Sequence, residues 1–234
     1  TNRSSAGQLK TMRLAQSFNG EDAAYFGAST EGTPADQVKV LSAFNATLTR
    51  CNGVYEKDLA LHLNLVASST NVIFYNPATD PYSTTLSQWN AQLQNTLSTT
   101  LTGASTSLAA NNAAYDIGHM FGASGGGGNA GWIGCVCVND TASTTDLNKG
   151  AGITSPADGI PMGDNFDIDY VVHEVGHQLG GNHTFSNNSE GTGVNMEVGS
   201  GVTIMGYAGI TAQDMAPHSI DIYNAATVTQ IQAN

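Results

Sequence analysis

The residues best suited to chemistry in this chain lie in one short stretch, H-E-V-G-H-Q-L-G-G-N-H, at positions 173–183. On a helix, His173 and His177 are four residues apart and share one face, so both imidazoles can reach one Zn²⁺ at about 2.0–2.1 Å. Glu174 lies between them in angle, where its carboxylate can contact a zinc-bound water without being a ligand. The pattern therefore predicts one catalytic Zn²⁺, with Glu174 as the general base that activates the water.

The end of the same stretch supplies a third ligand. Gly180 can adopt a positive φ and end the helix sharply, so His183 can turn back towards the metal. Three histidines leave one position open for water or substrate, as a catalytic zinc requires. Two alternatives are ordinary helix histidines beside a chance glycine and a structural zinc site. A structural site would have no use for Glu174.

The spacing matches the metzincin signature, H-E-x-x-H-x-x-G-x-x-H followed by a Met-turn. Residues 201–207 read G-V-T-I-M-G-Y, and Met205 resembles the methionine that metzincins place under the metal site. The stretches YDIGHMF, GWIGCVCV, KGAGITSP, GDNFDIDYVVHEVGHQLGGNHTF and GSGVTIMGYAGI also resemble bacterial reprolysin-like (adamalysin-related) proteases. The resemblance extends over residues 50–225. It implies a secreted zinc endopeptidase that hydrolyses internal peptide bonds of protein or peptide substrates.

The resemblance also implies an architecture. It indicates an α/β (α+β) metzincin-type zincin fold, with a twisted mixed sheet and the active-site helix below it. Residues 1–234 would form a single catalytic domain, divided into an upper subdomain of residues 1–183 and a small lower subdomain of residues 184–234 that carries the Met-turn. An edge strand over residues 131–138 would pair with an extended substrate, which is a sound way to hold a peptide by its backbone. Its substrate-binding residues would be Gly131, Trp132, Ile133 and Gly134.

Two positions depart from the adamalysin pattern. Thr184 follows the third histidine, where animal adamalysins have Asp, and Tyr207 stands two residues after Met205. The Met-x-Tyr spacing resembles that of astacins and serralysins, in which the tyrosine contacts zinc or the transition state. Tyr207 is therefore a candidate transition-state donor. The alternative is a packed tyrosine whose hydroxyl bonds to backbone.

The elements that must position these residues follow from hydrophobic periodicity and turn signals. Strands are expected at residues 9–18, 59–67, 72–75, 115–121 and 132–138, and helices at residues 34–50 and 86–101. Strands that alternate with helices favour α/β or α+β organisation. The run Gly125 to Gly128 lacks the Lys-Ser/Thr of a phosphate loop and is expected to be a flexible turn.

The amino-acid composition limits the classes of molecule that we expect the chain to bind. Charged residues make up only 11% of the chain, against about 25% in typical proteins, and 19 acidic residues against 7 basic ones give a net charge of −12. Such a surface disfavours nucleic acid and anionic membranes. Surface carboxylates could hold Ca²⁺, but we favour a role in keeping an exported protein soluble. The chain begins at Thr1 without a signal peptide and is expected to be the mature, secreted form of a longer precursor, acting as a monomer.

The remaining candidates carry less chemistry. Cys51 is expected to form a disulfide with Cys135 or Cys137, because neighbours two apart on a strand point to one face and cannot bridge each other without strain. Asp164, Asp167 and Asp169 precede the active-site helix, where negative charge interacts favourably with the helix dipole; the less favoured alternative for these three residues is a Ca²⁺ site. His62, His119 and His218 are expected to be ordinary surface or core histidines, and Glu197 and Asp214 are candidate Ca²⁺ ligands. The competing functional hypothesis is a non-catalytic, zinc-containing adhesin or binding module.

Overall fold

A five-stranded mixed sheet forms the centre of the protein. The computed structural model describes residues 8–103, 107–143, 145–188 and 190–234. The strands are β1 (Lys10–Phe18), β2 (Leu61–Leu65), β3 (Ile117–Phe121), β4 (Gly127–Asn129) and β5 (Gly152–Ser155), in the order β2-β1-β3-β5-β4. The pairs β1–β2, β1–β3 and β3–β5 are parallel, whereas β4 is antiparallel to β5 and lies at the edge. The predicted α/β fold with a mixed sheet is confirmed.

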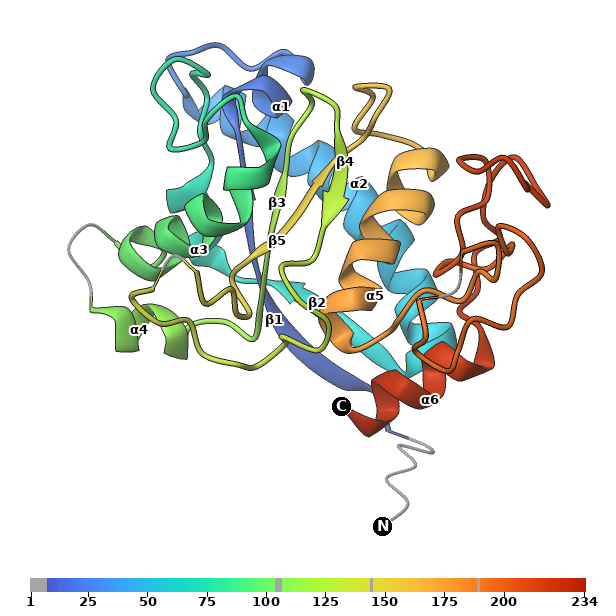
Figure 1. The fold of residues 1–234 in the computed structure, drawn as a ribbon. Coiled ribbons are helices and arrows are strands. Elements are labelled where there is room, and N and C mark those ends of the chain that lie inside the picture. Colours follow the sequence, from blue (N-terminus) through green and yellow to red (C-terminus); the bar gives the residue numbers. More distant parts are fainter. Residues whose placement is uncertain (1–7, 104–106, 144, 189) are drawn as a thin grey trace.

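Helices cover both faces of this sheet (Figure 1). The helical elements are α1 (Gly20–Tyr25), α2 (Pro34–Leu59), η1 (Ala67–Val72), η2 (Leu86–Gln88), α3 (Trp89–Thr100), α4 (Leu108–Ala113), the π-helix η3 (Asn165–Val172), α5 (His173–Leu179) and α6 (Ala225–Ala233). Alternate residues of β1 point to opposite faces, so Leu14 and Phe18 pack with α2, η3 and α5, while Ala15 packs with α3. The sheet is therefore buried on both sides, as a mostly parallel sheet requires.

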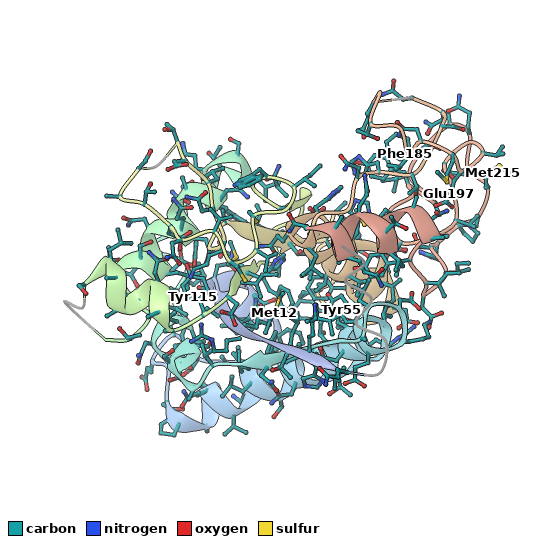
Figure 2. The ribbon with its side chains drawn as sticks, turned by 90° about the horizontal axis from the view of Figure 1, so that it is seen from below. Met12, Tyr55, Tyr115, Phe185, Glu197 and Met215 are labelled. Atoms are coloured by element: carbon teal, nitrogen blue, oxygen red, sulfur yellow. The ribbon has the colours of Figure 1, made fainter. Side chains whose placement is uncertain are left out.

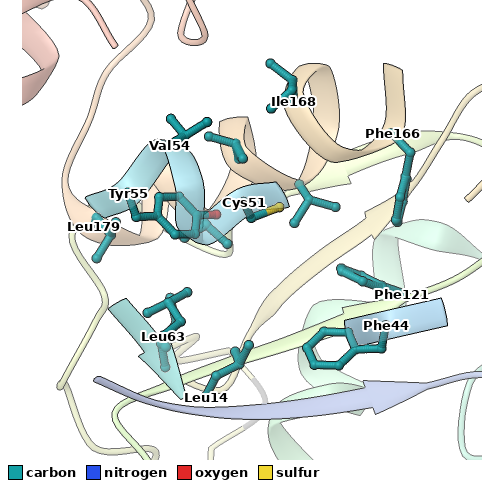
Figure 3. Packing of buried hydrophobic residues seen from close by; sticks show 14 of the residues in the cluster. Leu14, Phe44, Cys51, Val54, Tyr55, Leu63, Phe121, Phe166, Ile168 and Leu179 are labelled. Carbon is teal, nitrogen blue, oxygen red and sulfur yellow. The ribbon is translucent and has the colours of Figure 1, made fainter. Parts of the chain in front are cut away.

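Helix α2 is longer than its sequence pattern predicted. Thr33 and Asp36 form a capping box at its start, and Pro34 occupies the first turn. The helix continues to Leu59 because Val54 and Tyr55 extend its buried face. Figure 3 shows Cys51 and Tyr55 of α2 between the sheet and η3. This packing places η3 and α5, which form one continuous helical stretch, against the sheet.

The predicted strand over residues 132–138 is wrong. These residues form turns, and Gly131, Gly134 and Cys137 have φ values of 83°, 80° and 64°, which a regular strand does not allow. The edge strand is instead β4, which uses Gly127 and Gly128 of the run that was predicted to be a flexible turn. The short strand expected at residues 72–75 is a single bridge between Ile73 and Phe18, and β5 was not predicted.

The C-terminal segment, residues 184–234, projects from one end of the molecule and then packs back against its body. From residue 184 to residue 224 its described residues form turns and loops, with one bridge between Phe185 and Glu197. Figure 2 shows Phe185, Glu197 and Met215 in this projecting part. Helix α6 then packs back against α2. The division into two subdomains at His183 stays a prediction. Within the described ranges, no helix combines the length and apolar character needed to cross a bilayer.

The three cysteines are free thiols, so the predicted disulfide between Cys51 and Cys135 or Cys137 is not formed. The thiol of Cys51 lies 3.6 Å from Asp167 O, between α2 and η3. The thiol of Cys135 lies 3.7 Å from Ala130 O, in the loop after β4. The predicted disulfide assumed that residues 135 and 137 lie on a strand, and they do not. The two buried thiols, Cys51 and Cys135, lie in different parts of the structure.

Thiol titration tests this arrangement. Only Cys137 is exposed, and burial raises the pKa of the Cys51 and Cys135 thiols. The native protein should therefore expose one rapidly reacting thiol to an aromatic disulfide reagent, and the unfolded protein three, without any reductant. Fewer than three thiols in the unfolded, unreduced protein would show that a disulfide exists.

Candidate metal centre

Three histidine side chains converge beside α5, two from the helix and one from the segment after it. The Nε2 atom of His183 lies 3.0 Å from that of His177 and 3.2 Å from that of His173. Ligands at about 2.0–2.1 Å from a tetrahedral zinc are about 3.3 Å apart. Within the described residues, these histidines are the one group of three or more His, Cys, Asp or Glu side chains close enough to hold a metal ion. The structure thus brings together the three residues that the sequence predicted as ligands.

The second nitrogen of each ring is fixed by an acceptor. His173 Nδ1 lies 2.7 Å from Ile204 O, and His177 Nδ1 lies 2.7 Å from Gly181 O. His183 Nδ1 lies 2.9 Å from a carboxylate oxygen of Glu190. Because carbonyl and carboxylate oxygens only accept, each Nδ1 must carry the proton, which leaves the lone pair on Nε2.

Two of the rings are held neutral as well as oriented. Burial, and then the neighbouring histidines, lower the pKa of His173 well below its ordinary value and that of His177 to about 4. Imidazoles with convergent lone pairs repel one another unless a cation lies between them. Neutral imidazole nitrogen is also a preferred ligand of Zn²⁺. The residues present therefore fit a zinc ion.

The turn after α5 supplies the third ring. Gly180 has a φ of 120° and ends the helix, as its position in the sequence predicted. Gly181 N donates to Gly176 O at 2.9 Å, so the chain folds back on the last turn of α5. The carbonyl of Gly181 is then in place for His177. The turn at Gly180 and Gly181 thereby orients the ring of His177 and brings His183 back towards the metal site.

The predicted Met-turn lies directly beneath this site. Met205 is fully buried, and a Cβ added to Gly176 would lie only 2.7 Å from its sulfur. Ile204 O accepts the bond from His173, and Thr184 N donates to Met205 O at 3.0 Å. The turn therefore makes backbone contacts with the first ligand and with the residue after the third. Gly176 is needed for this close packing.

Glu197 ties the same two segments through its side chain. Its carboxylate accepts hydrogen bonds from Thr184 Oγ1 at 2.5 Å, from Val202 N at 2.8 Å, and from both the backbone and hydroxyl of Thr203. Burial alone would raise the pKa of Glu197, but these hydrogen bonds hold it below its ordinary value. Thr184 stands where the adamalysin pattern has Asp, and its hydroxyl contacts the carboxylate of Glu197. Through these hydrogen bonds, Glu197 anchors the Met-turn. Among the described residues, Glu197 belongs to no group of three or more His, Cys, Asp or Glu side chains that could hold a metal ion such as Ca²⁺.

Glu174 lies against the edge of the sheet. Its side chain is buried beside His173 and His177, and burial raises its pKa to about 8. A Cβ added to Gly128 of β4 would lie 2.3 Å from Glu174 Cγ. The glycine therefore lets the edge strand approach the carboxylate closely, so a chain paired with β4 would run past Glu174.

Tyr207 packs among aromatic rings at the metal site. Its ring centroid lies 4.6 Å from that of His183, 4.4 Å from that of Phe185 and 5.7 Å from that of His173. Burial, and then the charges of Glu174 and Glu190, raise the pKa of its phenol to about 12, so the hydroxyl keeps its proton. Within the described part of the chain, this hydroxyl bonds to no backbone group.

A cleft passes over the site and widens on each side of it. We call one side the Asp169 pocket, a cavity of about 270 Å³ lined by Gly126, Gly127, Gly128, Asn165, Asp169, Tyr170, Ile210, Pro217, His218 and Ser219. The other side, the Trp132 pocket, has about 420 Å³ and is lined by Gly128, Asn129, Gly131, Trp132, Ile133, His183, Glu190 and Thr192. Glu174 and Tyr207 line both pockets.

Three of the four predicted substrate-binding residues therefore lie in the cleft, but on a loop. Gly131, Trp132 and Ile133 line the Trp132 pocket. Gly134 instead donates from its backbone to His177 O at 2.9 Å and fastens the loop to α5.

The histidines outside the metal site have other partners. His119 is buried and bridges Gln178 of α5 and Thr154 of β5, each at 2.7 Å. His62 contacts Glu56 at 2.5 Å near the surface, and His218 contacts Asp169 at 2.8 Å. Among the described residues, none of these three histidines belongs to a group that could hold a metal.

Sequence reasoning missed the side chains that support the ligands. Glu190 lies seven residues after His183 in a Gly-rich loop, and nothing in its spacing signals a contact with that ring. Gly128 was included in a run assigned to a turn. One signal was available: a carboxylate soon after a third histidine is a plausible partner for its free ring nitrogen.

Comparison with known proteins agrees with this geometry. A family model described as metallo-peptidase family M12B, reprolysin-like, matches residues 9–234. The comparison with curated proteins gives no match.

The contact between Glu190 and His183 yields a prediction about zinc affinity. Replacing Glu190 with Gln removes the charged partner of the third ring and should weaken Zn²⁺ binding about 10–100-fold, measured by competition with a chromophoric chelator. The chain offers a matched control in Glu56, which contacts His62 Nδ1 in the same way. Glu56→Gln should leave zinc affinity unchanged. Equal affinities for all three proteins would show that Glu190 does not support the ligand.

Proposed function

Because the chain belongs to the M12B reprolysin-like family of metallopeptidases, we propose that it is a zinc-dependent endopeptidase acting on internal peptide bonds of protein substrates. One observation carries the proposal: three convergent histidine nitrogens lie beside the buried carboxylate of Glu174 in a cleft that continues on both sides. A substrate cut internally extends in both directions from the cleaved bond. A cleft of this form accommodates it.

The residues around the metal centre suit peptide hydrolysis. His173, His177 and His183 would hold a zinc ion, which acts as a Lewis acid on the scissile carbonyl and lowers the pKa of water. Glu174 is not needed as a ligand, and a zinc ion beside it would favour its charged form against the effect of burial, so its carboxylate is available to take a proton from the attacking water. It then passes that proton to the leaving amine. Removing water's proton and protonating the amine are the two transfers that the reaction requires.

Tyr207 is the proposed donor to the developing negative charge. Its ring packs against His183 and His173, and it lines both pockets. A phenol that keeps its proton can donate to the former carbonyl oxygen as that oxygen gains charge. The packing of the ring against His183 and Phe185 limits its movement and keeps the hydroxyl near the cleft.

The backbone of the substrate is proposed to pair with β4. This strand is hydrogen-bonded to β5 on one side only, so its other edge is available for an extended peptide. We further propose that the protein acts as a monomer outside the cell, and that it is of bacterial origin. A surface with few charged residues is consistent with export, and the resemblance to exported bacterial proteases supports the source.

Substitution of Glu174 tests the reaction. Glu174→Gln should lower casein hydrolysis by about 10³-fold or more while zinc content stays at one ion per chain, because the side chain acts on protons and is not a ligand. Activity is measured on zinc-loaded protein, with Glu56→Gln as a remote control of the same chemistry. A fully active Glu174→Gln protein would refute its role. An inactive zinc-loaded wild type would point to a non-catalytic binding module.

Tyr207→Phe tests the donor without opening a cavity. Loss of one transition-state hydrogen bond should lower kcat by about 10²–10³ with little change in KM. Tyr75→Phe removes a hydroxyl from a partly buried tyrosine that lines neither pocket, and it should leave kcat unaltered. An unchanged kcat in Tyr207→Phe would mean that the residue only packs.

A further inference from the structure

The Asp169 pocket has an acidic group set behind apolar walls. The carboxylate of Asp169 comes from η3 and is 12% exposed, whereas its partner His218 is 63% exposed and lies at the rim. Ala208, Ile210 and Pro217 supply apolar side chains to the lining, and Asn165, Tyr170 and Ser219 supply polar groups. An aliphatic stem can pack against such walls while a polar end group reaches the carboxylate. The volume of about 270 Å³ is ample for one long side chain.

No described basic residue neutralises Asp169 from within its pocket. Among the described residues, neither Lys nor Arg lines the Asp169 pocket. The described basic side chains lie elsewhere: Arg13 bonds to Asp116, Lys39 to Asp36, Arg50 to Asp164 and Asp221, Lys57 to Asp221 and Lys149 to backbone carbonyls, and Lys10 lines a separate pocket with α6. A carboxylate in a partly enclosed pocket attracts a cation more strongly than it does in open solvent.

The direction of β4 assigns the pocket to one side of the cleaved bond. This strand runs from Gly127, at the Asp169 pocket, to Asn129, at the Trp132 pocket. Antiparallel pairing is the more stable arrangement per residue, and a peptide that pairs antiparallel to β4 runs the opposite way, from the Trp132 pocket to the Asp169 pocket. Its residues before the cleaved bond then lie by Trp132, and the residue after the bond lies by Asp169.

We infer that the Asp169 pocket selects a lysine or arginine side chain at the first position after the cleaved bond, with Asp169 as the specificity-determining residue. This inference rests on the proposed peptidase function. Asp169 already accepts hydrogen bonds from Ser219 N and His218 Nδ1, each at 2.8 Å. A carboxylate has about four acceptor sites, so an incoming ammonium or guanidinium can add to these bonds. Since His218 is at the rim, it can also be displaced.

Matched peptides test the inference. The series is identical except for lysine, arginine, norleucine or glutamate after the cleaved bond, and norleucine gives an aliphatic stem without charge. Zinc-loaded wild type should cleave the lysine peptide with a kcat/KM at least about tenfold above that for norleucine. In Asp169→Asn this ratio should fall towards one, with cleavage of the norleucine peptide retained. The Asn side chain still accepts the bond from Ser219 N, which preserves the loop.

Two variants serve as controls. Asp164→Asn removes the same charge from a neighbouring surface position paired with Arg50, and it should leave the ratio unchanged. His218→Ala keeps the carboxylate and should keep the preference. The inference is overturned if norleucine equals lysine, if Asp169→Asn keeps the ratio, or if the basic preference lies before the cleaved bond. If zinc-loaded wild type cleaves none of the peptides or a random peptide library, the proposed function fails as well.

Discussion

Three imidazole nitrogens that carry lone pairs must face one another at about hydrogen-bond distance, and the rest of the active-site region depends on meeting this constraint. The fold meets it by giving each ring an acceptor on its far side: the carbonyls of Ile204 and Gly181, and the carboxylate of Glu190. Orientation is thus fixed before any cation binds, which limits the entropy lost on binding. Burial also lowers the pKa of His173 and His177, which disfavours protons at these two rings and leaves their lone pairs for a metal.

Several other contacts in the structure serve to hold the three histidine rings in this arrangement. The ring of His173 is held by the turn that contains Met205, so the turn must stay close to α5, and Gly176 provides the space. His183 belongs to a segment without regular secondary structure, and the carboxylate of Glu197 joins that segment to the same turn. On its opposite side, α5 is fastened to the sheet through Gln178. The ligands are therefore positioned from two directions by elements far apart in sequence.

Features of the structure that depend on local geometry could be predicted from local patterns in the sequence. The spacing of the histidines and Gly180 fixed one helix face and one turn, and the strand and helix periodicities gave the α/β class. The loop around Trp132 was misassigned because its apolar alternation resembles a strand, whereas the positive φ values of Gly131, Gly134 and Cys137 are not signalled by periodicity. The contacts of Glu197 could not be predicted, and those of Glu190 were signalled only by a carboxylate soon after the third histidine. Both sets of contacts depend on how a loop without periodic pattern folds over the helix.

The ligand set at the metal is the central claim, and X-ray absorption at the zinc edge measures it most directly. Zinc-loaded protein should show three imidazole nitrogens at about 2.0–2.1 Å and one oxygen ligand, with no sulfur. The spectrum should be unchanged in the Cys137→Ser protein, because the exposed thiol lies outside the site. A sulfur ligand, or fewer than three imidazoles in a fully loaded sample, would contradict a centre formed by His173, His177 and His183.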